Sequence, residues 1–324
     1  MCTAIALNDE GLYFGRTLDY DFSYPSQVVI APRNFPFRMQ RTEPLLRHYC
    51  LMGMAFVKNG YPLFFDAFNE EGLSMAGLNF EGDGKYSQVS FSSENVAYFE
   101  LIPYILGTCR NVPEARAQLL KINITEESFS PDLPVAHLHY IIADSCESIT
   151  LEVTKEGLRV YDNPMGVLTN NPPFPFQVQN LENYLNVSPK PAENRFSEKI
   201  EFSFYSRGMG ALGLPGDYSS MSRFVRAAFL KLNSPMAQSE QENVSRFFGI
   251  MDSVSVPKGA CVMENGNYQE TLYTCLMSAN RGVYYYTTKE NRRVSAVDMK
   301  KVDKRGSSLI CYPLRTREDI FLQN

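Results

Sequence analysis

Tryptophan is absent from the sequence, and histidine occurs only three times in 324 residues. No apolar run approaches the roughly 20 residues that cross a bilayer, so a membrane-spanning helix is not expected. Positive charge is not in surplus either, because 31 Lys and Arg face 36 Asp and Glu and leave a net charge of −5. Nucleic acid and anionic membranes require a basic face, so neither is an expected partner.

The cysteine pattern and the amino-terminal stretch speak to the cellular compartment. Seven cysteines, widely spaced and odd in number, include no CxxC pair. The amino-terminal stretch has no basic start, and Asn8, Asp9 and Glu10 end its short apolar run, so it does not resemble a secretion signal. These features predict reduced thiols and a cytoplasmic protein.

Pairs of strand-like segments dominate the chain. CTAIAL and LYFGRTLDY flank the turn NDEG, and PLFFDAF and LSMAGLNF flank the turn NEEG, which are hairpin signals. Helical patterns stand in blocks between the strand pairs, which favours an α+β fold with sheets packed on each other and helices outside. With no internal repeat and no composition shift, we expect one domain over residues 1–324. Further strands are expected at 137–144, 149–155, 158–163, 271–278, 282–288 and 293–299, and helices at 113–122, 222–233 and 239–254.

Two motifs that suggest ligand binding have simpler explanations. GMGALG at residues 208–213 matches a dinucleotide fingerprint, but Pro215 and Gly216 prevent the helix that would hold the pyrophosphate, so a glycine-rich turn is expected. His137 and His139 point to one face of a predicted strand. A metal site needs further ligands, and His48 is the only other histidine, so we expect structural hydrogen bonds, no metal and no cofactor.

Cys2 is the residue with the clearest chemical meaning. Removal of Met1, favoured when the second residue is small, would leave a thiol and an α-amino group on one residue, so no histidine base is needed. The NDEG turn brings Arg16 and Asp19 back toward the terminus. Arg16 would favour the thiolate, and Asp19 would orient the amino group. On residue types alone, a structural ion pair explains Arg16 and Asp19 equally well.

Several motifs occur together in the order of one known family. They are CTAIAL with FGRTLDY, NEEGLSMAGLNF, DNPMGVLTNNP, GLPGDYSSMSRFVR and GVYYYTT. The sequence resembles the choloylglycine hydrolase family, which includes bile salt hydrolases and penicillin V acylases, and is most similar to the bile salt hydrolases of gut bacteria. The resemblance runs from residue 2 to about the end of the chain. It implies an N-terminal-nucleophile hydrolase fold, a four-layer αββα arrangement of two stacked antiparallel sheets between helix layers.

The resemblance also implies a set of catalytic residues. Cys2 would be the nucleophile, Asn170 would supply the side-chain amide that stabilises the oxyanion, and Asn79 would lie near the same hole. The first asparagine of LTNNP, rather than Asn171, matches the family pattern. The complete set of matching positions is Cys2, Arg16, Asp19, Asn79, Asn170 and Arg223.

The same resemblance implies the substrate class. Asn79 stands where penicillin V acylases often carry tyrosine, which favours hydrolysis of glycine- and taurine-conjugated bile acids. Lys58 stands where some relatives place an aromatic residue at the pocket rim. Two alternatives are a penicillin V acylase and a non-catalytic steroid-binding protein that retains Met1. The resemblance further implies a homotetramer, with residues 186–217 reaching a neighbouring subunit. The expected apolar pocket residues are Leu18, Phe65, Phe129, Leu133 and Leu138.

Overall fold

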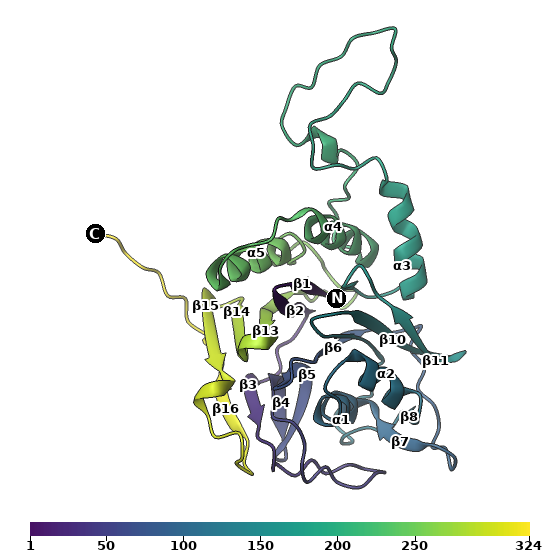
Figure 1. The fold of residues 1–324 in the computed structure, drawn as a ribbon, viewed down its shortest axis with the longest axis vertical. Helices are drawn as coiled ribbons and strands as arrows, with labels where there is room; N and C mark the ends of the chain where they lie inside the picture. The colour runs from purple at the N-terminus through teal and green to yellow at the C-terminus, as the bar shows by residue number, and fades with distance from the viewer.

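Two large antiparallel sheets form the centre of the molecule (Figure 1). The computed structural model describes residues 1–324, with side chains for residues 1–8 and 10–324. The six-stranded sheet has the order β12 (Val167–Leu168), β1 (Cys2–Asp9), β2 (Gly11–Tyr20), β13 (Glu270–Ser278), β14 (Val283–Thr288), β15 (Asn291–Asp298). The eight-stranded sheet has the order β11 (Gly157–Asp162), β10 (Ser148–Thr154), β9 (Leu138–Ala143), β6 (Ser74–Asn79), β5 (Tyr61–Asn69), β4 (Leu51–Lys58), β3 (Ser26–Ala31), β16 (Ile310–Pro313).

Helices cover the outer faces of both sheets. The helices α4 (Ser220–Asn233) and α5 (Glu240–Asp252) contact strands of the six-stranded sheet, while α1 (Leu101–Thr108) contacts β4, β5 and β6 of the other. Helix α2 (Val112–Leu119) lies beside α1 (Figure 1). Strand β6 contacts β1 and β2, so the two sheets are stacked on each other. The predicted four-layer arrangement is confirmed.

Two apolar cores fill the spaces between these layers. One joins the inner faces of the sheets to α4 and α5, and includes Phe14, Phe68 and Phe224. The other lies between the eight-stranded sheet and α1, and includes Ala67 and Leu101. Adjacent residues of β5 therefore belong to different cores, as the two-residue period of a strand requires. Strands buried on both faces explain why the hydrophobic runs of the sequence are nearly continuous.

The helix boundaries follow local capping signals. Helix α5 begins after Ser239, which forms a capping box with Glu242. The helix predicted at 113–122 was too long, because α2 ends at Leu119. Ile122 instead begins β8 (Ile122–Thr125), which pairs in parallel with β7 (Glu94–Ala97) and buries the Ile122 side chain. Among the helices of the described chain, none has the length and apolar character needed to cross a bilayer.

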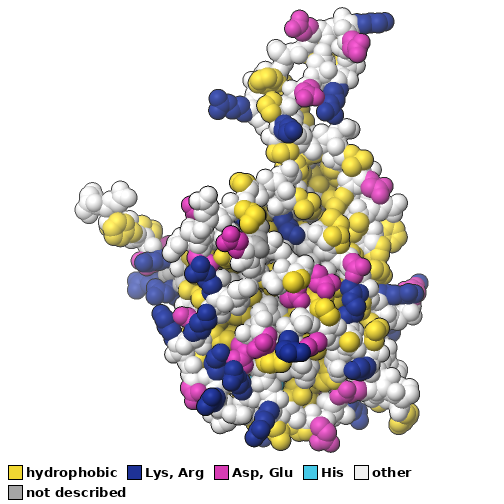
Figure 2. Space-filling view, viewed as in Figure 1, with side chains coloured by type: hydrophobic (Ala, Val, Ile, Leu, Met, Phe, Trp, Pro, Cys, Tyr) yellow, Lys and Arg dark blue, Asp and Glu magenta, His cyan; other side chains and the backbone are white. Residues whose placement is uncertain are grey.

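Residues 185–218, here called the projecting segment, extend away from the stacked layers after α3 (Phe174–Asn180) and the short turn η2 (Leu181–Tyr184) (Figure 1). Figure 2 shows hydrophobic and charged side chains together on its surface. The GMGALG motif lies within it and forms the short turn η3 (Met209–Ala211), with Gly208 at a φ of 82°. The predicted glycine-rich turn is confirmed. The carboxyl-terminal residues 320–324 are exposed and extend away from the sheets (Figure 1).

Candidate active site

Cys2 is the first residue of β1 and lies opposite Leu18 of β2, as the predicted hairpin requires. Its side chain is almost fully buried, with 3% of the residue exposed. The backbone nitrogen of Cys2 donates a 2.8 Å hydrogen bond to Oδ1 of Asn170. Met1 continues the pairing with β2, since its nitrogen donates to the Asp19 carbonyl oxygen at 2.9 Å and its own carbonyl accepts from the Asp19 amide at 3.1 Å.

Arg223 ties the Cys2 and Asn170 segments together. It lies in the first turn of α4, which Ser219 caps, and its side chain is fully buried. One guanidinium nitrogen, Nη2, donates to Oδ1 of Asn170 at 2.8 Å. The other, Nη1, donates to the Cys2 carbonyl oxygen at 2.5 Å and to Oγ1 of Thr3 at 2.7 Å. Arg223 thus fixes the backbone at Cys2 and the orientation of the Asn170 amide together.

Asn79 and Asn170 come from different strands and meet beside Cys2. Asn79 is the last residue of β6, and Asn170 follows β12. Nδ2 of Asn170 donates to the Asn79 carbonyl oxygen at 2.7 Å, which leaves its second N–H for another acceptor. The Asn170 backbone amide donates to Oγ of Ser220 at 2.8 Å. The Asn170 side chain therefore links the Cys2 nitrogen to the end of β6, and Asn79 lines the same pocket as Cys2.

Asp19 is held by two hydroxyl groups. Its carboxylate accepts hydrogen bonds from Oγ1 of Thr17 at 3.2 Å and from Oγ1 of Thr271 at 2.6 Å. The sequence suggested that Asp19 would orient the Cys2 nitrogen. With Met1 in place, the Cys2 nitrogen is a peptide N–H that donates to Asn170, and the Met1 backbone pairs with the backbone of Asp19, so the role of Asp19 stays a prediction.

Arg16 is the second buried guanidinium of the site, and 1% of the residue is exposed. Nη1 donates to the Gly77 carbonyl oxygen at 2.6 Å, and Nε donates to the Thr17 carbonyl oxygen at 3.1 Å. Among the residues that the structure describes, Nη2 has no hydrogen-bond partner. Burial opposes the positive charge of Arg16, but its electrostatic interactions with neighbouring groups, Cys2 and Tyr273 before Asp66, outweigh burial and raise the pKa of Arg16.

Asp66 is a fully buried carboxylate that interacts with Arg16. It accepts hydrogen bonds from the hydroxyl groups of Tyr273 at 2.6 Å and Tyr284 at 2.7 Å. Burial raises the pKa of Asp66, although Arg16 and the tyrosine hydroxyls oppose the shift. Sequence analysis missed this group, because strands separated by more than 200 positions carry its members.

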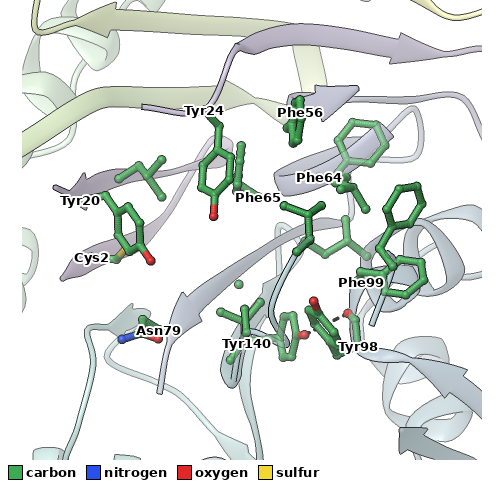
Figure 3. A pocket seen from close by; sticks show the side chains of 18 of the residues that line it. Cys2, Tyr20, Tyr24, Phe56, Phe64, Phe65, Asn79, Tyr98, Phe99 and Tyr140 are labelled. Atoms are coloured by element: carbon green, nitrogen blue, oxygen red, sulfur yellow. Dashed lines mark hydrogen bonds between the residues drawn. The ribbon is translucent and has the colours of Figure 1, made fainter. Parts of the chain in front are cut away.

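A largely apolar pocket opens beside Cys2 (Figure 3). Cys2, Tyr20 and Asn79 lie at one end of it, and Phe64, Tyr98 and Phe99 lie at the other (Figure 3). The structure brings together in its lining all five residues that the resemblance suggested: Leu18, Phe65, Phe129, Leu133 and Leu138.

Several lining residues were missed by sequence analysis. Tyr20 follows Leu18 at the two-residue strand period, and that spacing would have identified it. Tyr24 and Tyr98 lie outside the predicted strands and gave no such signal. Lys58 is not part of the lining, and its amine pairs with Asp132. The missed residues are Tyr20, Tyr24, Phe56, Leu63, Phe64, Gly77, Tyr98, Phe99, Ile102, Pro134, Ala136 and Tyr140.

The two histidines of the HLH motif have separate environments. His139 is buried and contacts Glu152 and the Thr169 carbonyl oxygen. His137 precedes β9. Its Nδ1 lies 3.4 Å from Oε2 of Glu81, and its Nε2 lies 3.6 Å from Oε1 of Glu126. No cluster of three His, Cys, Asp or Glu side chains suited to a metal is found among residues 1–8 and 10–324.

Comparison with known sequences gives full-length matches. The model of the linear amide C–N hydrolases of the choloylglycine hydrolase family matches residues 2–312. A bile salt hydrolase/transferase from Lactiplantibacillus plantarum is 46% identical over 324 residues, which is 100% of both chains. A bile salt hydrolase/transferase from Clostridium perfringens is 33% identical and matches over 96% of each chain.

Solved structures agree with this assignment. A crystal structure of a mutant conjugated bile acid hydrolase from Clostridium perfringens matches with a TM-score of 0.93 at 32% identity, over 100% of both chains. The penicillin V acylase from Agrobacterium tumefaciens shares the fold, with a TM-score of 0.75 at 19% identity over 98% of this chain and 94% of its own. The resemblance inferred from the motifs is confirmed, and the chain belongs to the choloylglycine hydrolase family of linear amide C–N hydrolases.

Proposed function

We propose that this protein hydrolyses the amide bond of glycine- and taurine-conjugated bile acids, with Cys2 as its nucleophile. The observation that carries the proposal is the position of Cys2 in the lining of an apolar pocket that Arg16 and Asn79 also line, with the Cys2 nitrogen hydrogen-bonded to Asn170. The bile salt hydrolase relatives that match over their full length support the substrate class.

The proposed reaction begins once Met1 has been removed. The Cys2 nitrogen is then an α-amine with an ordinary pKa of about 7.7–8.0, and it can accept the thiol proton near neutral pH. Oδ1 of Asn170 already lies 2.8 Å from this nitrogen and accepts its hydrogen bond. Arg16, buried and with Nη2 unpartnered among the described residues, stabilises the thiolate.

Acylation follows by attack of Sγ on the amide carbonyl carbon of the substrate. The carbonyl oxygen becomes an oxyanion, which the free N–H of Asn170 and the Asn79 side chain stabilise. The C–N bond then breaks, and the protonated α-amine gives its proton to the departing glycine or taurine nitrogen. Water attacks the resulting thioester and releases the bile acid, with the same amine acting as base.

The residues that line the pocket bind the steroid body of the substrate. Its aromatic and aliphatic side chains supply apolar area, and burial of such area is worth roughly 25 cal/mol per Å². Asn79 lines the Cys2 end of the pocket, at the position where the family resemblance implies that penicillin V acylases often carry a tyrosine. This is the reason for placing bile acids ahead of penicillin V.

We also propose that the protein is a cytoplasmic homotetramer assembled through the projecting segment. All seven cysteines are free, which suits a reducing compartment. The segment exposes large hydrophobic side chains that a neighbouring subunit would cover. They are Leu185, Phe196, Ile200, Phe202, Phe204, Tyr205 and Leu212.

The decisive experiment measures glycine released from glycocholate by the purified, reduced protein. Cys2→Ala is assayed beside it, and intact mass establishes whether Met1 is gone. Release that Cys2→Ala abolishes supports the proposal. Cleavage of penicillin V without glycine release favours the acylase alternative. Folded protein that retains Met1, binds bile acids and cleaves neither substrate favours the steroid-binding alternative.

A further inference from the structure

His139 and Glu152 form a hydrogen-bonded pair in the interior of the eight-stranded sheet. His139 lies on β9 and Glu152 on the neighbouring β10, and both residues are fully buried. Nδ1 of His139 is 3.2 Å from Oε1 of Glu152. Burying polar groups this deeply costs free energy unless they are hydrogen-bonded, and Oε2 of Glu152 has no hydrogen-bond partner among the described residues. The proposed reaction uses neither side chain.

Each member of the pair also holds one end of the same chain segment. Nε2 of His139 is 2.9 Å from the carbonyl oxygen of Thr169, and since a carbonyl can only accept, Nε2 is the donor. Oε1 of Glu152 accepts a 2.8 Å hydrogen bond from the backbone amide of Phe174. The residues between these two anchors are 170–173, and they begin with Asn170.

The imidazole of His139 also contacts the other half of the site. The Phe80 ring stacks on it with a centroid distance of 4.3 Å and an interplanar angle of 9°. Phe80 directly follows Asn79, the last residue of β6. One buried ring therefore touches the immediate chain neighbours of both asparagines.

We propose that His139 and Glu152 are positioning residues that set the Asn170 amide against the developing oxyanion. The proposal rests on the proposed hydrolase function and deepens it. An oxyanion donor acts only at hydrogen-bond distance, and a misplacement near 1 Å can lower a rate on the order of a hundredfold. Gln177 also holds this segment, through Nε2 to the Asn170 carbonyl at 3.1 Å and to the Pro172 carbonyl at 3.3 Å, but it does not contact the flanking residues Thr169 and Phe174 that the pair anchors.

His139→Phe tests the donor directly. It keeps a ring for stacking on Phe80 and removes the hydrogen bond to Thr169. We expect kcat to fall roughly tenfold to a hundredfold with KM nearly unchanged. His139→Gln, which retains a donor, should recover part of the lost kcat. Glu152→Gln is the second variant, because it keeps the shape of the side chain if His139→Phe does not fold.

Two further readouts separate positioning from general damage. Alkylation of Cys2 by iodoacetamide needs no oxyanion hole, so its rate should match the wild type. The alkylation is followed on the amino-terminal peptide, because the exposed thiols of Cys146 and Cys311 react with iodoacetamide as well. Backbone amide exchange over residues 169–174 should rise in the variants and remain unchanged over α5.

The outcomes are distinct. A folded His139→Phe or Glu152→Gln variant with wild-type kcat overturns the proposal, as does alkylation that slows in parallel with kcat. If the wild type releases no glycine, the hydrolase function fails on its own account. Amide exchange then still tests whether His139 and Glu152 hold residues 170–173 in place. Exchange over residues 169–174 that is the same in the variants and the wild type overturns this structural role as well.

Discussion

The backbone nitrogen of Cys2 lies 2.8 Å from Oδ1 of Asn170, although 168 positions separate the two residues. The same oxygen accepts from Arg223, and the amide nitrogen on its other side donates to the Asn79 carbonyl. One side chain thus joins the start of β1, the end of β6 and the first turn of α4. Its replacement should affect the proposed nucleophile, Cys2, and the proposed stabilisation of the oxyanion together.

Asn170→Ala should reduce kcat on the order of a hundredfold or more, because it removes an oxyanion donor worth roughly 2.7–4 kcal/mol. Glycine release from glycocholate measures the effect. Asn171→Ala is the matched control, since that side chain points to Glu81 and Asp83 instead and should leave kcat close to wild type. Equal losses in both variants would show that the segment, rather than the Asn170 amide, matters.

An alanine inserted between Met1 and Cys2 should abolish hydrolysis while leaving the fold intact. Met1 is then removed ahead of the alanine, and the Cys2 nitrogen stays a peptide amide that cannot take up the thiol proton. The structure accommodates a residue before Cys2, because Met1 pairs there with the backbone of Asp19. Intact mass must show the retained alanine. Glycine release by that species would mean the α-amine is not the base.

Phe129→Ala should raise KM about tenfold with a much smaller change in kcat. Phe129 packs on Tyr61 and Phe99 in the pocket, away from Cys2, so its ring contributes apolar contact rather than chemistry. Phe91→Ala is the control, because Phe91 is fully exposed and outside the lining. A fall in kcat with constant KM would contradict this role.

Glu70 should make stability depend on pH in the acid range. Burial opposes its charge, but hydrogen bonds from Arg33, the Cys50 amide and Lys304 outweigh it and lower the pKa of Glu70 from 4.5 to about 2. The stabilisation is complete above pH 4.5 and is lost as pH falls toward 2. Urea unfolding of wild type and Glu70→Gln should therefore differ most at pH 6 and converge near pH 2. The neighbouring Glu71→Gln, on an exposed side chain, should track the wild type. A constant difference across this range would contradict the prediction.

The double variant Phe202→Ser, Phe204→Ser should dissociate the proposed tetramer. Both side chains are 55% exposed on the projecting segment, so they add little to the interior of one chain. Sedimentation velocity measures the oligomeric state. Leu232→Ser, an equally exposed apolar position on α4, is the control and should stay tetrameric. A wild-type monomer at micromolar concentration would refute the assembly.

Much of the site was predictable from local sequence. The NDEG turn sets the register of β1 against β2, and this alone places Cys2 opposite Leu18. The flanking strands also follow from their alternation and turn residues. The five suggested lining residues came from family motifs, and all line the pocket.

Other features had no local signal. Strands β3 and β4 and helix α1 were not predicted, because segments buried on all sides show neither a two-residue nor a 3.6-residue period. The hydrogen-bond partner of the Cys2 nitrogen could not be predicted from the sequence either. Asp19 is near in the hairpin, while Asn170 lies 168 positions away and just after β12, which comes close to Cys2 only because β12 pairs with β1.

The two ends of the chain have opposite surroundings (Figure 1). The first residues are enclosed by the sheets, whereas Ile320, Phe321 and Leu322 stand free in solvent. For the proposed enzyme, any affinity tag or fusion partner left at the front end would block the reacting amine. Attachment to a bead, an electrode or a display scaffold should therefore be made through the tail, where the catalyst keeps its free first residue.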